Sequence, residues 1–197
     1  FWAMPDEERM HAHEVMLDQA SGRIPLIAGC HHQSVKQATV LARHAGDIGY
    51  DFAIVLTPYV AARDDDCVFA FYEYICERVD IGIVLFNVPQ VCHSIEPGLA
   101  KRLAALPNIC AYKQANPGPA ATHSIMQAVG NDLVISVADE APWMTSMTQL
   151  GIDLVIELQP TSLSSSRMAA AQGLYRSRHG RRYQTRHRDC LLIAAAA

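Results

Sequence analysis

The sequence predicts an α/β fold built on a parallel sheet, and three observations lead to that prediction. The chain has 197 residues and is 50% hydrophobic, which is enough for one buried domain and short for two. Its apolar runs are short, rich in Val, Ile and Leu, and do not alternate with polar residues, as in strands covered on both faces. Segments with helical signals separate these runs. Such an alternation requires a parallel sheet with helical crossovers.

Apolar runs of strand length mark the expected strands. Each run is short, and Pro58 and Pro89 are expected to end two of the strands. The runs cover residues 24–30, 52–59, 81–88, 109–112, 133–137 and 153–158.

Capping signals mark the starts of the first helices. Pro5 followed by acidic residues is typical of a helix start, because proline fits the first turn and negative charge suits the helix N-terminus. Ser34 is expected to cap a second helix that stops near Gly46 or Gly49. Acidic residues at 64–66 precede a third helix, whose expected buried side comprises Val68, Phe69, Tyr72, Ile75 and Cys76. Further helices are expected over residues 97–106, 122–129 and 141–150.

The charge is unevenly distributed along the chain. The net charge is −4, yet the last 31 or so residues are rich in arginine and contain a single acid, Asp189. Such a tail could bind nucleic acid, but a short Arg/His run without regular aromatic residues favours a solvated terminus. We therefore expect a domain over residues 1–172 and a basic, poorly ordered tail over 173–197.

Several classes of function are disfavoured by what the sequence lacks. No apolar run reaches the ~20 residues that span a bilayer, so a cytoplasmic protein without a membrane partner is expected. The six cysteines form no C-x-x-C pair, and the close pairs His11/His13 and His31/His32 come without a regular set of further ligands. We expect no metal, and histidines that face solvent or cap helices. Without a glycine-rich phosphate loop, a nucleophile elbow or an H-E-x-x-H motif, no cofactor is expected.

Lys113 is the candidate catalytic residue. It closes the run 108–113, at the carboxyl end of an expected parallel strand, where α/β proteins carry their active sites. A half-desolvated amine there favours its neutral form, which can attack a carbonyl to give a Schiff base. The alternative is a lysine that extends from the strand end into a salt bridge. Other polar groups at expected strand ends are Tyr59, Asn87, Asp139, Glu140 and Glu157.

Six strings of residues carry a resemblance to a known family. They are Pro5-Asp-Glu-Glu-Arg9, Gly22-Arg-Ile-Pro-Leu-Ile-Ala-Gly29, Leu56-Thr-Pro-Tyr59, Leu85-Phe-Asn-Val-Pro89, Pro107-Asn-Ile-Cys-Ala-Tyr-Lys-Gln114 and Gln149-Leu-Gly151. In order and spacing they resemble the dihydrodipicolinate synthase / N-acetylneuraminate lyase family, and the similarity covers residues 3–172. The resemblance implies a (β/α)8 TIM barrel, incomplete here with about six strands, and usually a homo-oligomer.

The resemblance also implies an activity. Members form a Schiff base between a lysine and pyruvate or a related 2-oxo acid, and Lys113 falls on that lysine. The implied function is a lyase or aldolase of the class I type, with the 2-oxo acid as its small-molecule partner. Tyr59, Asn87 and Ile156 are the expected substrate-binding residues.

Departures from the family pattern favour a second hypothesis. Phe86 stands where the family has the tyrosine that shuttles protons, and phenylalanine has no hydroxyl for that role. Val60 replaces a second tyrosine, and Val91 replaces the arginine that binds the substrate carboxylate. The first two barrel strands and the Gly-Thr-Thr-Gly-Glu type loop have no counterpart in the chain. A catalytically silent barrel fragment or paralogue with a structural or oligomerising role is therefore the alternative.

Overall fold

The computed structural model describes residues 3–60, 62, 64–115 and 118–138, together with the backbone of 154–155 and 193–194. Helices and strands alternate from α1 to β5. In order, they are α1 (Asp6–Ala20), β1 (Leu26–Gly29), α2 (Val35–Ile48), β2 (Phe52–Leu56), α3 (Asp65–Cys76), β3 (Gly82–Asn87), α4 (Pro97–Ala104), β4 (Ile109–Gln114), α5 (Pro119–Val129), β5 (Val134–Val137), β6 (Leu154–Val155) and β7 (Ile193–Ala194).

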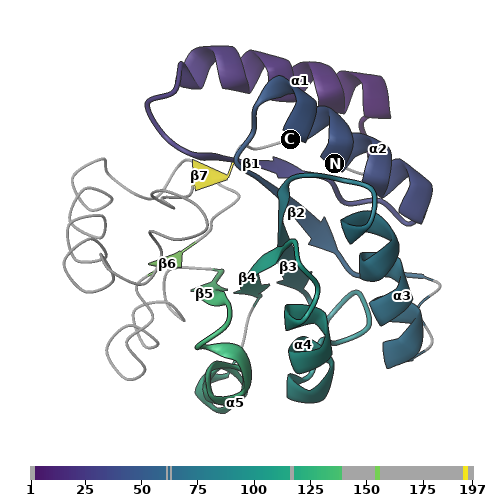
Figure 1. The fold of residues 1–197 in the computed structure, drawn as a ribbon, viewed down its shortest axis with the longest axis vertical. Helices are drawn as coiled ribbons and strands as arrows, with labels where there is room; N and C mark the ends of the chain where they lie inside the picture. The colour runs from purple at the N-terminus through teal and green to yellow at the C-terminus, as the bar shows by residue number, and fades with distance from the viewer. Residues whose placement is uncertain are drawn as a thin grey trace.

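The strands form one parallel sheet in the order β6-β5-β4-β3-β2-β1-β7. Strands β1 to β6 are neighbours in the sheet in the order in which they occur in the chain, as right-handed β-α-β units place them. Helices α1 to α5 form an arc outside the curved sheet (Figure 1). This arrangement confirms the predicted α/β class and is that of part of a (β/α) barrel.

The sheet divides the apolar residues into two layers. The larger layer lies between the sheet and the helices and includes Leu85, Tyr112 and Leu99. The smaller layer lies on the inner face of the sheet and is made of strand residues together with Ala115, directly after β4. Because successive side chains of a strand point to opposite faces, each strand supplies both layers. The buried residues of the inner layer are Ile27, Phe52, Ile54, Leu56, Val84, Phe86, Ala111 and Ala115.

The predicted capping signals are mostly confirmed. Asp64 precedes α3, and its side chain accepts a hydrogen bond from the Cys67 N–H at 2.8 Å. Gly49 ends α2 in the left-handed conformation, with φ of 104°, which glycine adopts without strain. Ser34 does stand at the start of α2, but its side chain makes no capping bond. Its own N–H instead donates to Nδ1 of His32 at 2.8 Å.

Several predicted boundaries differ from the observed ones; the strand expected over 52–59, for example, ends at Leu56. The helix expected over 122–129 begins at Pro119, because proline fits the first turn of a helix. Strand β4 continues past the apolar run to Gln114, since Lys113 and Gln114 pair with Phe86 and Asn87 of β3.

The helix expected over 141–150 lies outside the described residues. So does most of the tail expected over 173–197, of which residues 193–194 pair with Leu26 and Ile27 of β1. The predicted division into a domain and a poorly ordered tail stays a prediction.

Candidate active site

Four side chains form a row across the sheet at the carboxyl ends of the strands. In the register of the sheet, Leu56 of β2 pairs with Phe86 of β3, Phe86 pairs with Lys113 of β4, and Lys113 pairs with Ser136 of β5. Leu56 and Phe86 belong to the inner layer. Paired residues of neighbouring strands point to the same face, so Lys113 and Ser136 face the inside as well.

Lys113 is buried in this row. Only 1% of its surface is exposed, and its Nζ lies 4.4 Å from the centre of the Phe86 ring. An amine at that distance is held over the ring face by a cation–π contact when it is charged. The two other lysines differ, because Lys36 and Lys101 lie exposed on α2 and α4. The sequence prediction placed Lys113 at the end of a strand, and it occupies the last position but one of β4.

His31 also contacts the Phe86 ring. The centres of the His31 and Phe86 rings are 5.6 Å apart. His31 follows β1 and is 4% exposed. Its Nδ1 accepts a hydrogen bond from the Leu56 N–H at 3.0 Å. The expectation of a solvent-facing or capping histidine is therefore wrong for His31, because the inward alternation of β1 continues beyond the end of the strand.

Burial keeps the His31 ring neutral. Desolvation, together with the nearby charges of Arg9 and Lys113, lowers the pKa of His31 to about 3. Because Nδ1 accepts a hydrogen bond, the single proton of the neutral ring belongs on Nε2. That nitrogen lies on the inner side of the sheet, 3.9 Å from the position that a Cβ on Gly29 would take. The site thus contains a neutral histidine that can donate a hydrogen bond.

The hydroxyl of Ser136 has no hydrogen-bond partner within the part of the chain that the structure describes. The residue is fully buried, and an unsatisfied buried hydroxyl lowers stability. We therefore expect Ser136→Ala to raise the free energy of unfolding by about 1 kcal/mol, measured by urea denaturation. A matched Ser124→Ala change removes an exposed hydroxyl on α5 that donates to the Ala120 carbonyl, and should alter stability by less than ~0.5 kcal/mol. A clear loss of stability in Ser136→Ala would contradict the expectation.

Tyr59 lies on the same side of the sheet as Lys113. Its half-buried side chain packs against the inner layer. The N–H groups of Tyr59 and Val60 both donate to Oε1 of Gln33, at 2.8 and 3.1 Å, which holds the loop after β2. By contrast, Val60 and Val91 are exposed, with 81% and 48% of their surfaces open.

Asn87 lies on the other face of the sheet. Its Nδ2 donates to Oε1 of Gln114 at 3.0 Å, and its Oδ1 accepts from the Ile95 N–H at 2.9 Å. The pairing partner of its neighbour Phe86 is Lys113, so Asn87 points toward the helices. Both ends of the amide thus hold β3, β4 and the segment before α4 together. Ile156, Asp139, Glu140 and Glu157 lie outside the described residues.

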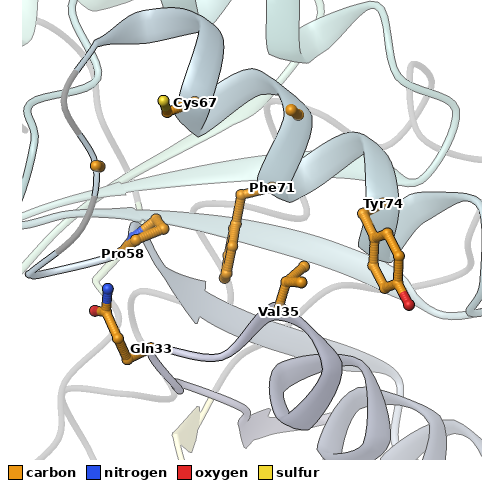
Figure 2. Close-up of a pocket in the computed structure, with 8 residues that line it drawn as sticks. Gln33, Val35, Pro58, Cys67, Phe71 and Tyr74 are labelled. Atoms are coloured by element: carbon orange, nitrogen blue, oxygen red, sulfur yellow. The ribbon is translucent and has the colours of Figure 1, made fainter.

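A separate groove of about 340 Å³ opens between the start of α2 and α3. Figure 2 shows Gln33, Val35 and Pro58 on one side of it and Phe71 and Tyr74 of α3 on the other. Its lining is mainly apolar and contains none of the predicted catalytic or substrate-binding residues. The groove is therefore distinct from the inner face that contains Lys113.

No group of three or more His, Cys, Asp or Glu side chains in the described part is arranged to hold a metal ion. Among the helices of that part, none is long and apolar enough to cross a membrane.

Comparison with known proteins agrees with this geometry. The model of the dihydrodipicolinate synthetase family matches residues 1–173. The 4-hydroxy-tetrahydrodipicolinate synthase of Pseudomonas putida is 28% identical over 172 residues, which are 85% of this chain and 59% of that protein. The enzyme of the same name from Pseudomonas aeruginosa is 29% identical over 171 residues, again 85% of this chain and 59% of the relative.

Solved structures show the same relationship. A dihydrodipicolinate synthase from Acinetobacter baumannii, complexed with pyruvate, is 28% identical with a TM-score of 0.67, over 70% of this chain and 47% of that one. Dihydrodipicolinate synthase from Aquifex aeolicus is 25% identical with a TM-score of 0.74, over 86% of this chain and 56% of the other. The chain thus spans roughly half to three fifths of the length of these relatives. The chain belongs to the dihydrodipicolinate synthetase family.

Proposed function

We propose that this chain forms a Schiff base between Lys113 and pyruvate or a related 2-oxo acid, as a lyase or aldolase of the class I type. The observation that carries the proposal is the place of Lys113, buried at the carboxyl end of β4 on the inner face of the sheet. Burial of a lysine disfavours its charged form in general, and the neutral amine is the nucleophile. We also propose that the protein is a homo-oligomer, which its resemblance to the family implies.

The reaction begins with attack of the Lys113 amine on the substrate carbonyl carbon. The Phe86 ring contacts the amine, but it has no hydroxyl that could transfer a proton. Loss of a proton relay commonly slows a reaction by ~10²–10⁴-fold, so a slow reaction is expected. Tyr59, packed against the inner layer, is the proposed substrate-contacting phenol.

A reductive trapping experiment tests the proposal. The protein is incubated with pyruvate and reduced with borohydride, and the mass of the intact chain is measured. We expect one adduct per chain, since reduction fixes the imine as a stable amine, and no adduct in Lys113→Ala. Lys101→Ala, which removes an exposed lysine on α4, should label like the unaltered protein. Absence of an adduct with pyruvate and with other 2-oxo acids would refute the proposal.

The second candidate function is that of a catalytically silent barrel with a structural or oligomerising role. Phe86 favours it, because this aromatic side chain contacts Lys113 and lacks a hydroxyl. The same trapping experiment separates the two functions. A folded protein that assembles with itself but gives no adduct would support the silent barrel.

A further inference from the structure

Two polar side chains, Lys113 and His31, contact the ring of Phe86. Lys113 Nζ lies 4.4 Å from its centre, and the His31 ring centre lies 5.6 Å from it. His31 and Lys113 also interact electrostatically through this buried region, since the lysine charge is one cause of the lowered His31 pKa. A ligand that reacts with Lys113 above Phe86 would therefore have the imidazole beside it.

We propose that His31 is a catalytic residue of the Lys113 site, and that its Nε2–H donates a hydrogen bond to the carbonyl oxygen of the substrate during imine formation. The proposal rests on the proposed function of Lys113. It assigns the hydrogen-bond donor at this ring to a histidine two residues after β1, because Phe86 itself has no hydroxyl. The His31 ring is fixed for this role, because Nδ1 accepts from the Leu56 N–H and leaves the proton on Nε2.

A neutral imidazole suits the charge that develops in this step. When the amine of Lys113 attacks, a C–N bond forms and the π electrons of the carbonyl move to its oxygen. A proton moves from nitrogen to that oxygen and gives a carbinolamine, whose hydroxyl then leaves with the second amine proton as water while the C=N bond forms. A fixed N–H donor in a buried site stabilises the negative oxygen of the first step, and a neutral histidine can do so.

The residues around His31 hold its ring in place and keep it neutral, as the proposed role requires. Gly29, two residues earlier on β1, has no side chain, and the His31 ring occupies the space over it on the inner face. Arg9 of α1 donates to the Gly29 carbonyl at 2.9 Å and contributes to keeping His31 neutral. Two contacts therefore position the His31 ring. The Leu56 N–H donates to its Nδ1, and the backbone at Gly29 packs against its other edge.

The rate of imine formation tests the proposal. Protein is mixed with pyruvate, reduced with borohydride at timed intervals, and the adduct at Lys113 is measured by mass spectrometry, corrected for the folded fraction by circular dichroism. We expect His31→Phe to label at least ~10²-fold more slowly than the unaltered protein. His31→Gln, whose amide can still donate, should fall between the two.

A second measurement separates catalysis from mere support of the fold. In a Phe86→Tyr background the new phenol supplies a donor, so His31→Phe should slow labelling there by less than ~10-fold. If His31 only supported the fold, His31→Phe would slow labelling equally in the unaltered and the Phe86→Tyr protein, and that result would overturn the proposal. Equal rates in folded His31→Phe and the unaltered protein would also overturn it. Should His31→Phe not fold, His31→Met gives the same comparison. No Lys113 adduct in the unaltered protein would instead refute the proposed function.

Discussion

Replacing Phe86 by tyrosine is expected to raise the rate of imine formation at Lys113 about 100-fold. The Phe86 ring already contacts Lys113 Nζ at 4.4 Å and lies on the inner face of the sheet, 8% exposed. A hydroxyl on this ring would lie beside the reacting amine and could move the protons that imine formation requires. Timed borohydride trapping with pyruvate measures the change.

The matched control adds the same hydroxyl elsewhere. Phe69→Tyr places a phenol on α3, where Arg102 lies over the ring at 4.8 Å, far from the inner face. Its labelling rate should equal that of the unaltered protein. A folded Phe86→Tyr protein with an unchanged rate would show that the missing hydroxyl is not what limits the reaction.

Acidification from pH 7 to pH 5 is expected to lower the free energy of unfolding by about 4 kcal/mol. Burial, with the Arg9 and His44 charges, lowers the pKa of His13 to about 4, and burial lowers the pKa of His31 to about 3. An unfolded histidine titrates near 6.5. Below that pH the unfolded chain binds both protons and the folded chain does not, so stability present above pH 6.5 is lost as the pH falls. Urea denaturation at the two pH values measures the loss.

His13 offers a direct check of this linkage. Neither of its ring nitrogens has a hydrogen-bond partner in the described part of the chain, and it is 2% exposed. His13→Leu should therefore remove about half of the pH dependence. His11→Gln alters an exposed histidine on the same helix, whose side chain is 76% exposed, and should leave the dependence unchanged. An equally steep loss of stability in His13→Leu would contradict the assignment.

The fold could be predicted well from the sequence, because strands that are covered on both faces consist almost entirely of apolar residues. Strand β2 is apolar at every position and β3 is apolar from Ile83 to Phe86, since both faces of the sheet are covered. The boundaries were less predictable. Strand β4 extends over Lys113 and Gln114 because the neighbouring strands β3 and β5 pair with them, and that tertiary effect leaves no apolar signal in the sequence.

The site was predictable only in part. The position of Lys113 could be inferred from the end of an apolar run, and the structure places it there. His31 was missed, although Ile27, Gly29 and His31 alternate onto one face, because a histidine after a strand is more often exposed. Asn87 follows Phe86 directly, and the alternation of side chains along a strand therefore turns it away from Lys113. Ser136 was missed because a single serine in a strand has no motif around it.

The distribution of a trapped 2-oxo acid over the three lysines tests the central claim most directly. Lys36 and Lys101 are exposed, whereas Lys113 is buried on the inner face. After incubation with pyruvate, borohydride reduction and proteolysis, we expect the adduct on the peptide that contains Lys113 and at background level on the other two. Labelling confined to Lys36 and Lys101, or spread equally over all three, would contradict the claim that this family member positions Lys113 as its reactive amine.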